Sequence, residues 1–182
     1  MQVPQTIHFS EDFSDNNAGW VLGTEWQISA ATSSSAHNYG GPDPESDFSS
    51  TQDDGVAGAA IGGNISTSVH GYYYVTSPVY DTSQIQGSLW VGYRRWLNSD
   101  HLPYMQNSVE VYDGTTWITL WASGNSPGVQ DSSWTSQAHD IAAYKGAQMQ
   151  LRFGHKILKA GSYTVSGFNI DDVVIANVVC SP

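Results

Sequence analysis

The sequence predicts an all-β fold, a two-sheet antiparallel sandwich, from its aromatic-rich composition, its short strand-like runs and its near lack of helical patterns. The chain has 182 residues, with 7 Trp, 10 Tyr and 5 Phe, and only 13% of its residues are charged. Aromatic residues suit pleated sheets, whereas long helices usually carry abundant Glu, Lys and Ala. The length fits one domain over residues 1–182, which is long enough to bury a sizeable core.

Strand candidates in the first half of the chain are short runs bounded by Gly, Asn, Asp, Ser or Pro. They are residues 6–10, 19–22, 25–30, 55–61, 71–76 and 88–97. In the last of these runs, alternation puts Leu89, Val91 and Tyr93 on one side of the strand. Trp90 and Arg94 fall on the other side, so this run is expected to bury one face.

A β-hairpin is predicted where residues 108–112 and 116–121 flank the pair Asp113-Gly114. Asp-Gly readily adopts the positive φ that tight turns require. Later strand candidates are residues 138–141, 147–154 and 163–179. About ten strands in all fit a sandwich of two sheets. The intervening residues 31–54 are too polar and turn-rich to form core, and are either a functional loop or an idle surface excursion.

The charge of the chain limits its partners. Seventeen acidic and six basic residues give a formal net charge of -11, which would repel a phosphate backbone, so nucleic acid is not an expected partner. Carboxylates are ligands that Ca²⁺ prefers, which makes calcium the first cofactor to test. The single cysteine, Cys180, allows no internal disulfide and no cysteine-based zinc cage, so it is either free or paired outside this sequence.

The chain is expected to be an extracellular monomer. It has no apolar run of about 18 residues, so no membrane insertion is predicted. Its first residues, MQVPQTIHFSEDF, lack the apolar core of a signal peptide, and an export signal would have to precede them. Low lysine content and an acidic surface are common outside cells, which favours secretion.

The adjacent carboxylates of Asp171 and Asp172 stand inside an apolar strand-like run. They would repel each other unless one reaches solvent or a cation lies between them. Two interpretations remain open: a strand bend with one solvated Asp, or a calcium site. The candidate partner acids stand on the opening strand and at the end of the long polar stretch, at Glu11, Asp12, Asp53 and Asp54.

A second candidate surface is the aromatic and basic segment around RRWLNSDHLPY. Rings can stack on a sugar while Arg and Asp side chains make bidentate hydrogen bonds to it. The predicted ligand-binding residues are Tyr93, Arg95, Trp96, Asp100 and Tyr104. In the alternative interpretation these aromatics fill the core and the arginines pair with nearby acids.

Four segments in order, FSEDFSDNNAGW, YYYVTSPVYDTS, VEVYDGTTWITLW and NIDDVVI, resemble MAM and cleaved-adhesin modules of secreted proteins, with a likeness to reelin subrepeats. The resemblance implies a jelly roll, concanavalin-like or galactose-binding-like, that is often attached to a secreted bacterial peptidase. It also implies a structural calcium, whose ligands match Glu11, Asp53 and Asp171 by position. The chain lacks the disulfide-forming cysteines of animal MAM domains, so the bacterial modules are the better comparison.

Catalysis is not predicted. The six histidines are scattered, without the spacing that places two metal ligands on one helix, and no Gly-x-Ser-x-Gly motif is present. Glu25, Glu45 and Glu110 could converge as glycosidase carboxylates, but nothing in the sequence selects a pair. We therefore predict a non-catalytic accessory module that binds an extracellular polysaccharide. The alternatives are an adhesion domain that binds a cell-surface protein and, third, a glycan-active enzyme.

Overall fold

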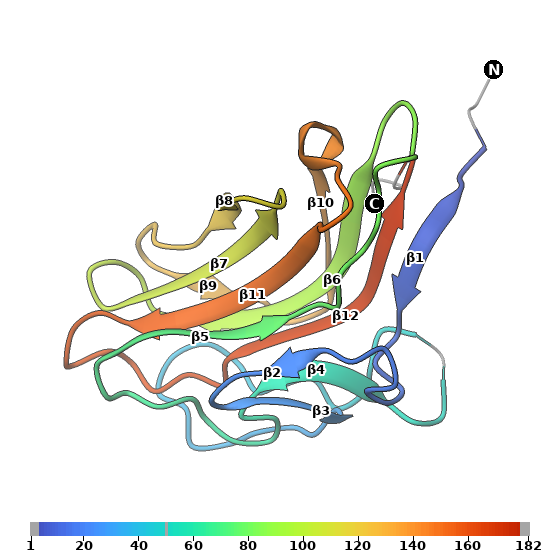
Figure 1. Ribbon diagram of the computed structural model, residues 1–182. Helices are drawn as coiled ribbons and strands as arrows, with labels where there is room; N and C mark the ends of the chain where they lie inside the picture. The colour runs from blue at the N-terminus through green and yellow to red at the C-terminus, as the bar shows by residue number, and fades with distance from the viewer. Residues whose placement is uncertain (1–3, 50, 179–182) are drawn as a thin grey trace.

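Two antiparallel β-sheets face each other in the structure, a computed structural model that describes residues 4–49 and 51–178 (Figure 1). Sheet A contains β1 (Ile7–Glu11), β3 (Trp26–Ala30), β4 (Gly55–Ala59), β6 (Trp90–Ser99), β9 (Val129–Gln130), β10 (Thr135–Asp140) and β12 (Phe168–Ala176). Its main order is β10-β6-β12-β4-β3, with β1 on β12 and β9 on β6. Sheet B has the order β2-β5-β11-β7-β8. Its strands are β2 (Val21–Leu22), β5 (His70–Thr76), β7 (Met105–Tyr112), β8 (Trp117–Ala122) and β11 (Gln150–Ile157).

This architecture confirms the predicted all-β antiparallel sandwich, and every strand candidate overlaps an observed strand. The predicted hairpin is β7–β8, with Gly114 at φ 97° in its turn. The two-residue strand β9 was not predicted, because a run of two residues shows no alternation. A short 3-10 helix spans Ala142–Tyr144. The last strand candidate was expected to reach Val179, which lies outside the described residues, as does Cys180.

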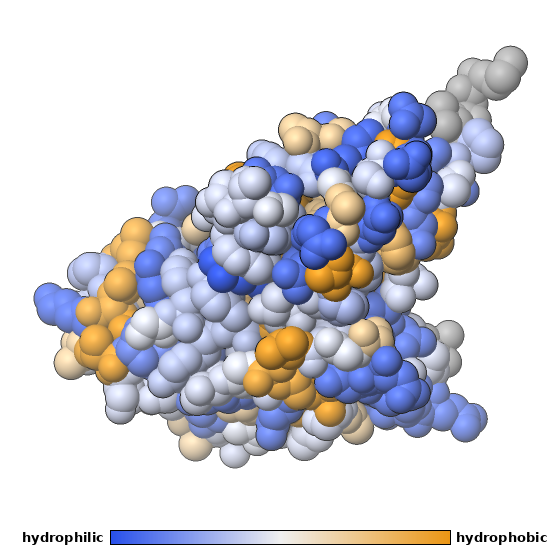
Figure 2. Space-filling view, viewed as in Figure 1, coloured by the Kyte–Doolittle hydropathy of each residue, from blue (hydrophilic) through white to orange (hydrophobic). Residues whose placement is uncertain are grey.

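The core lies between the sheets and is built by alternation along the strands. Leu89, just before β6, and Val91 on it are fully buried and Tyr93 is nearly so, as the sequence predicts. On β11, the inward residues include Phe153, which contacts Phe168 of β12 edge-on at 6.1 Å between ring centroids. Offset and edge-on aromatic pairs are the favoured arrangements of buried rings. Figure 2 shows that on the side seen in Figure 1 hydrophobic residues form separate patches within a largely hydrophilic surface.

Strand β12 carries two different neighbours along one edge. Asn169 and Ile170 pair with β4, whereas its residues 173–176 pair with β1, so β1 and β4 follow one another along the same edge (Figure 1). We call their junction the seam. The first and last strands are therefore neighbours in sheet A. At the seam β12 has a β-bulge, with Asp172 at φ 47°, because one extra residue enters between the pairs Asp171–Arg94 and Val174–Gly92.

The long polar segment 31–54 covers part of the outer face of sheet A. The Trp96 indole donates a hydrogen bond to the Pro42 carbonyl at 2.9 Å, and Asn169 donates one to Asp43 at 2.7 Å. As expected, this segment adds no residue to the buried hydrophobic cluster of the described chain, but it does bury polar side chains, among them Asp43, which is 1% exposed. Its carboxylate tolerates burial because it accepts hydrogen bonds from Asn169 and the Gly62 amide. None of the helices in the described part of the chain is long and apolar enough to span a membrane.

Candidate functional site

The outward side chains of sheet B form an aromatic and charged surface, which we call the open face. Alternation along four strands of this sheet places these side chains on the side away from the core. Its residues are Tyr72, Tyr74, Gln106, Glu110, Trp117, Arg152 and Lys156. All are partly exposed except Glu110, which is 6% exposed. Sheet A has its outer face partly covered by the segment 31–54, so the open face is the better candidate for binding.

Two tyrosines lie side by side on the open face. Tyr72 and Tyr74 follow each other at alternate positions of β5, and their rings stack with centroids 5.1 Å apart. Tyr74 pairs with Gly154 of β11, and a Cβ at position 154 would overlap the Tyr74 ring. Gly154 therefore lets both rings lie flat across the neighbouring strand. The hydroxyl of Tyr72 donates a hydrogen bond to Gln106 at 3.2 Å, which orients the ring further.

Arg152 is held at the centre of the open face. Its guanidinium lies over the Tyr74 ring at 3.9 Å and over the Trp117 ring at 4.0 Å, measured to the ring centroids. It also donates a hydrogen bond through Nε to Glu110 at 2.7 Å. Cation–π contacts and a paired carboxylate fix the planar group in one orientation. Arg152, Tyr74, Trp117 and Glu110 thus form a preorganised polar and aromatic surface.

Burial and charge raise the tyrosine pKa values on this face. Burial raises the pKa of Tyr74 well above its usual range, and the Glu110 carboxylate, which accepts a hydrogen bond from its hydroxyl at 3.1 Å, raises it further. Burial likewise raises the pKa of Tyr72. Both phenols therefore stay protonated at neutral pH, so each can donate and accept hydrogen bonds. Flat rings edged with hydroxyl, amide and guanidinium groups suit a ligand with an apolar face and a polar rim, such as a sugar.

The residues predicted to bind a ligand do not lie on the open face. Tyr93 is 3% exposed and packs in the core, and Asp100 is 2% exposed and accepts a hydrogen bond from the Tyr163 amide. Arg95 forms an ion pair with Asp131 at 2.9 Å. Tyr93 and Arg95 follow the alternative interpretation, in which aromatics fill the core and arginines pair with acids. Burial leaves Tyr93 and Asp100 no surface for direct contact with a ligand.

Trp96, in contrast, lies beside a surface pocket of about 390 Å³. Its ring meets that of Trp134 edge-on at 5.8 Å between centroids, and the segment 41–46 lines the pocket together with Asp131 and Ser132. Both indole N–H groups donate hydrogen bonds to carbonyls of this segment. Tyr104 is half-buried beside His101, and its ring does not line this pocket. The structure therefore separates Trp96 from Tyr104, which the sequence placed in one site.

The acids predicted to bind calcium gather along the seam. Glu11 ends β1, and its carboxylate accepts hydrogen bonds from the Phe13 amide at 2.9 Å and the Trp20 indole at 3.0 Å. Asp53 precedes β4, and its Oδ2 lies 2.8 Å from the position of a Cβ on Gly55. The Phe13 carbonyl oxygen faces the same position. A carboxylate and a carbonyl oxygen thus converge next to the turn that follows Glu11.

Asp171 and Asp172 have different surroundings. Asp171 is fully buried and accepts hydrogen bonds from the Phe48 amide at 2.8 Å and the Asp172 amide at 2.7 Å. Burial raises its pKa to about 6, although these hydrogen bonds act in the opposite direction. Asp172 lines a separate surface pocket with Glu11 and Asp12. The six acids therefore share the seam without all meeting at one point; the half-buried Asp54, at φ 52°, leads into β4.

The three glutamates considered for glycoside cleavage do not converge. Glu110 lies on the open face with Arg152, whereas Glu25 contacts His155, whose side chain points to the other side of sheet B. Glu45 is exposed in the covering segment.

The open face was not predicted from the sequence, although the alternation in residues 72–74 and 150–157 indicates which side chains face away from the core. Its parts come from four strands, and only the sheet order brings them together.

Comparison with known proteins identifies the fold. No protein-family model matches this chain, and no curated protein matches its sequence. Among solved structures it resembles the xylan-binding CBM22-1 domain of Paenibacillus barcinonensis Xyn10C, with 13% identity and a TM-score of 0.51 over 99% of this chain and 100% of that one. It also resembles the K3 cleaved adhesin domain of Lys-gingipain from Porphyromonas gingivalis, with 12% identity and a TM-score of 0.48 over 93% and 98% of the two chains. The chain is thus a jelly-roll sandwich; the expected likeness to MAM domains stays a prediction.

Proposed function

We propose that this protein is a non-catalytic extracellular module that binds polysaccharide on the open face of sheet B. The observation that carries the proposal is the fixed arrangement of Tyr72, Tyr74 and Trp117 around Arg152. A fold supports many functions, so the site itself has to supply the chemistry. Here partly exposed rings offer flat surfaces to sugar rings, and the polar groups between them offer hydrogen bonds to hydroxyls.

Xylan is the first polysaccharide to test, because the solved domain that shares this fold at a TM-score of 0.51 binds xylan. The low identity of 13% does not carry the ligand over, so a panel of neutral and acidic polysaccharides is needed beside it. The formal net charge of -11 disfavours strongly acidic polymers over most of the surface. Yet Arg152 and Lys156 both lie on the open face and offset this charge locally.

The test is affinity electrophoresis of the protein in gels that contain each polysaccharide, followed by calorimetry with the best ligand. Trp117→Ala and Tyr72→Ala remove rings from the open face, and Trp96→Ala removes the ring of the other pocket. The proposal expects retardation of wild type and of Trp96→Ala, and loss of retardation in the open-face variants. Loss in Trp96→Ala alone would instead assign the ligand to the surface predicted from the sequence.

The alternative is an adhesion domain that binds a cell-surface protein through the same fold. It gains support if wild type binds no polysaccharide in the panel while its circular dichroism and melting show a folded protein. Catalysis is a third possibility. It is checked by incubating the protein with the bound polysaccharide and measuring new reducing ends.

A structural calcium ion at the seam is the second part of the proposal. Donors around the seam are carboxylates and a backbone carbonyl, the oxygen ligands that Ca²⁺ prefers. Glu11, Asp53 and Asp171 are the first residues to test, with Asp12, Asp54 and Asp172 beside them. An ion there would link the end of β1 to the start of β4. At this point along β12 the neighbouring strand changes from β4 to β1. The extracellular setting proposed for this module supplies calcium.

A further inference from the structure

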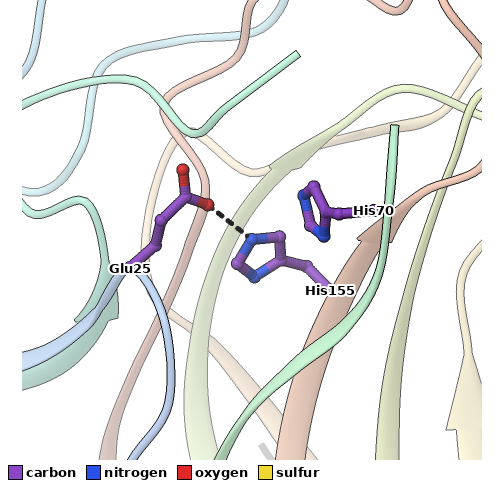
Figure 3. Close-up of side chains that lie close together, drawn as sticks. All are labelled: Glu25, His70 and His155. Atoms are coloured by element: carbon purple, nitrogen blue, oxygen red, sulfur yellow. Dashed lines mark hydrogen bonds and ion pairs between the residues drawn. The ribbon is translucent and has the colours of Figure 1, made fainter. Parts of the chain in front are cut away.

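Three potential metal ligands from distant parts of the chain meet inside the sandwich, away from the open face (Figure 3). Glu25 stands in the turn before β3, His70 begins β5, and His155 lies on β11. Their ligand atoms all lie within 4.8 Å of one another. Among residues 4–49 and 51–178, no other group of three His, Cys, Asp or Glu side chains meets this condition.

His70 presents a free imidazole nitrogen to the group. Its Nδ1 lies 2.6 Å from the Gly71 carbonyl oxygen, which can only accept a hydrogen bond, so Nδ1 carries the proton. Nε2 then has a lone pair, and it is buried with no hydrogen-bond partner among the described residues. The ring is held in place by stacking on Tyr73, with centroids 3.8 Å apart. A histidine oriented through one nitrogen by a backbone carbonyl is a common arrangement of metal ligands.

His155 and Glu25 are fixed as firmly. His155 is 0% exposed, its Nε2 lies 2.8 Å from Glu25 Oε2, and its Nδ1 has no partner in the described part of the chain. The other Glu25 oxygen accepts a hydrogen bond from the Ser66 amide at 2.8 Å. Glu25 has φ 69°, an uncommon conformation for a residue with a long side chain. The fold therefore holds this carboxylate toward the two imidazoles against a backbone preference.

From this geometry we infer that Glu25, His70 and His155 bind a divalent transition-metal ion, and that Zn²⁺ is the ion they fit best. Two imidazoles and one carboxylate are a ligand set that Zn²⁺ favours, whereas Ca²⁺ takes oxygen ligands. Tetrahedral bonds of about 2.0–2.2 Å require ligand atoms about 3.3 Å apart. The ligand atoms of the present group lie within 4.8 Å of one another, and binding the ion would draw them together to that spacing.

The fourth coordination position is left to water. The Glu25 side chain is 20% exposed, which gives the ion a route from solvent, while Trp26 and Tyr73 pack around His155. The ion would join the turn between β2 and β3 to two strands of sheet B. It is a structural cross-link, and it is independent of sugar binding because His155 faces away from the open face.

The test uses the metal-stripped full chain, titrated with Zn²⁺ against a chromophoric chelator. Wild type is expected to bind one Zn²⁺ per chain. His70→Gln and Glu25→Gln are expected to weaken binding by about 100-fold or more, since loss of a merely supporting partner costs 10–100-fold. The control His101→Gln removes a histidine with the same local contact, its Nδ1 being 2.7 Å from the next carbonyl oxygen. It should bind Zn²⁺ as wild type does.

Co²⁺ gives a second readout that does not depend on stability. Bound to this group it should show the intense visible bands of four-coordinate Co²⁺, and His70→Gln should abolish them. Absence of saturable Zn²⁺ binding, or equal affinity in wild type, His70→Gln and Glu25→Gln, overturns the inference. Sugar binding and the response to Ca²⁺ should be unchanged in these variants, so the inference and the proposed function can fail separately.

Discussion

Tyr74 lies directly opposite Gly154 in the pairing of β5 with β11, and its ring occupies the space that a side chain at 154 would take. This relationship links the sequence of one strand to the binding surface built on its neighbour. The open face exists in its present form because position 154 has no Cβ.

Gly154→Ala should displace the Tyr74 ring and weaken polysaccharide binding. Overpacking of this kind costs about 1–3 kcal/mol of stability, so the melting temperature should fall as well. Calorimetry and thermal melts measure the two effects. Gly71→Ala is the matched control, because a Cβ at position 71 meets nothing within 4 Å. Equal binding by wild type and Gly154→Ala would show that the ring position does not matter.

Glu110→Gln should destabilise the protein by about 1–3 kcal/mol. Glu110 Oε2 accepts from Arg152 at 2.7 Å, and Oε1 accepts from the hydroxyls of Tyr74 and Ser108 at 3.1 and 2.9 Å. In the Gln variant one of these two oxygens is replaced by an NH₂ group. That group would face a hydrogen-bond donor and could not accept from it. Urea unfolding measures the change, with the exposed Glu45→Gln as control. A midpoint equal to that of wild type would contradict the importance of this pair.

Asp43 should contribute stability as the pH falls from 7 to 5. Burial raises the pKa of Asp43 to about 6, above its unfolded value, so the folded state binds the proton more tightly. The stabilisation is complete below the unfolded pKa and is lost as the pH rises through about 6. By linkage it amounts to about 1 kcal/mol between pH 7 and pH 5.

The measurement for Asp43 is urea unfolding of wild type and Asp43→Asn at pH 5, 6 and 7. Asn does not titrate, so the stability of the variant should lack this part of the pH dependence. Other groups titrate equally in both proteins, and the difference between the two curves isolates Asp43. Parallel curves would mean that the Asp43 carboxyl has an ordinary pKa.

Calcium should stabilise the wild-type protein. At about 100 times its dissociation constant it adds about 2.7 kcal/mol by mass action, and a chelator should remove this gain. Asp171→Ala and Glu11→Gln should lose the difference between melts in calcium and in chelator, whereas the exposed Asp81→Asn should keep it. Using this difference separates calcium binding from the intrinsic cost of removing Asp171, which accepts hydrogen bonds from backbone amides. Identical melts of wild type in calcium and chelator would exclude the site.

The sequence by itself determined the fold class and most strands of this protein. Period-two alternation in β6 and the Asp113-Gly114 turn are local properties, since each residue's side of a strand and each turn's φ depend on close neighbours. The acidic balance and the doubled aspartate at 171–172 likewise pointed to the seam, where the structure shows a β-bulge.

Only the tertiary structure decided which of these residues meet. Alternation already places Tyr93 and Trp96 on opposite faces of β6, but only the structure shows that the segment 41–46 crosses the outer face and forms a pocket with Trp96. Tyr74, Arg152 and Trp117 form one surface, and Glu25, His70 and His155 one cluster, through strand pairings between distant segments. Strand order is set by the packing of two whole sheets, an interaction that no short stretch of sequence contains.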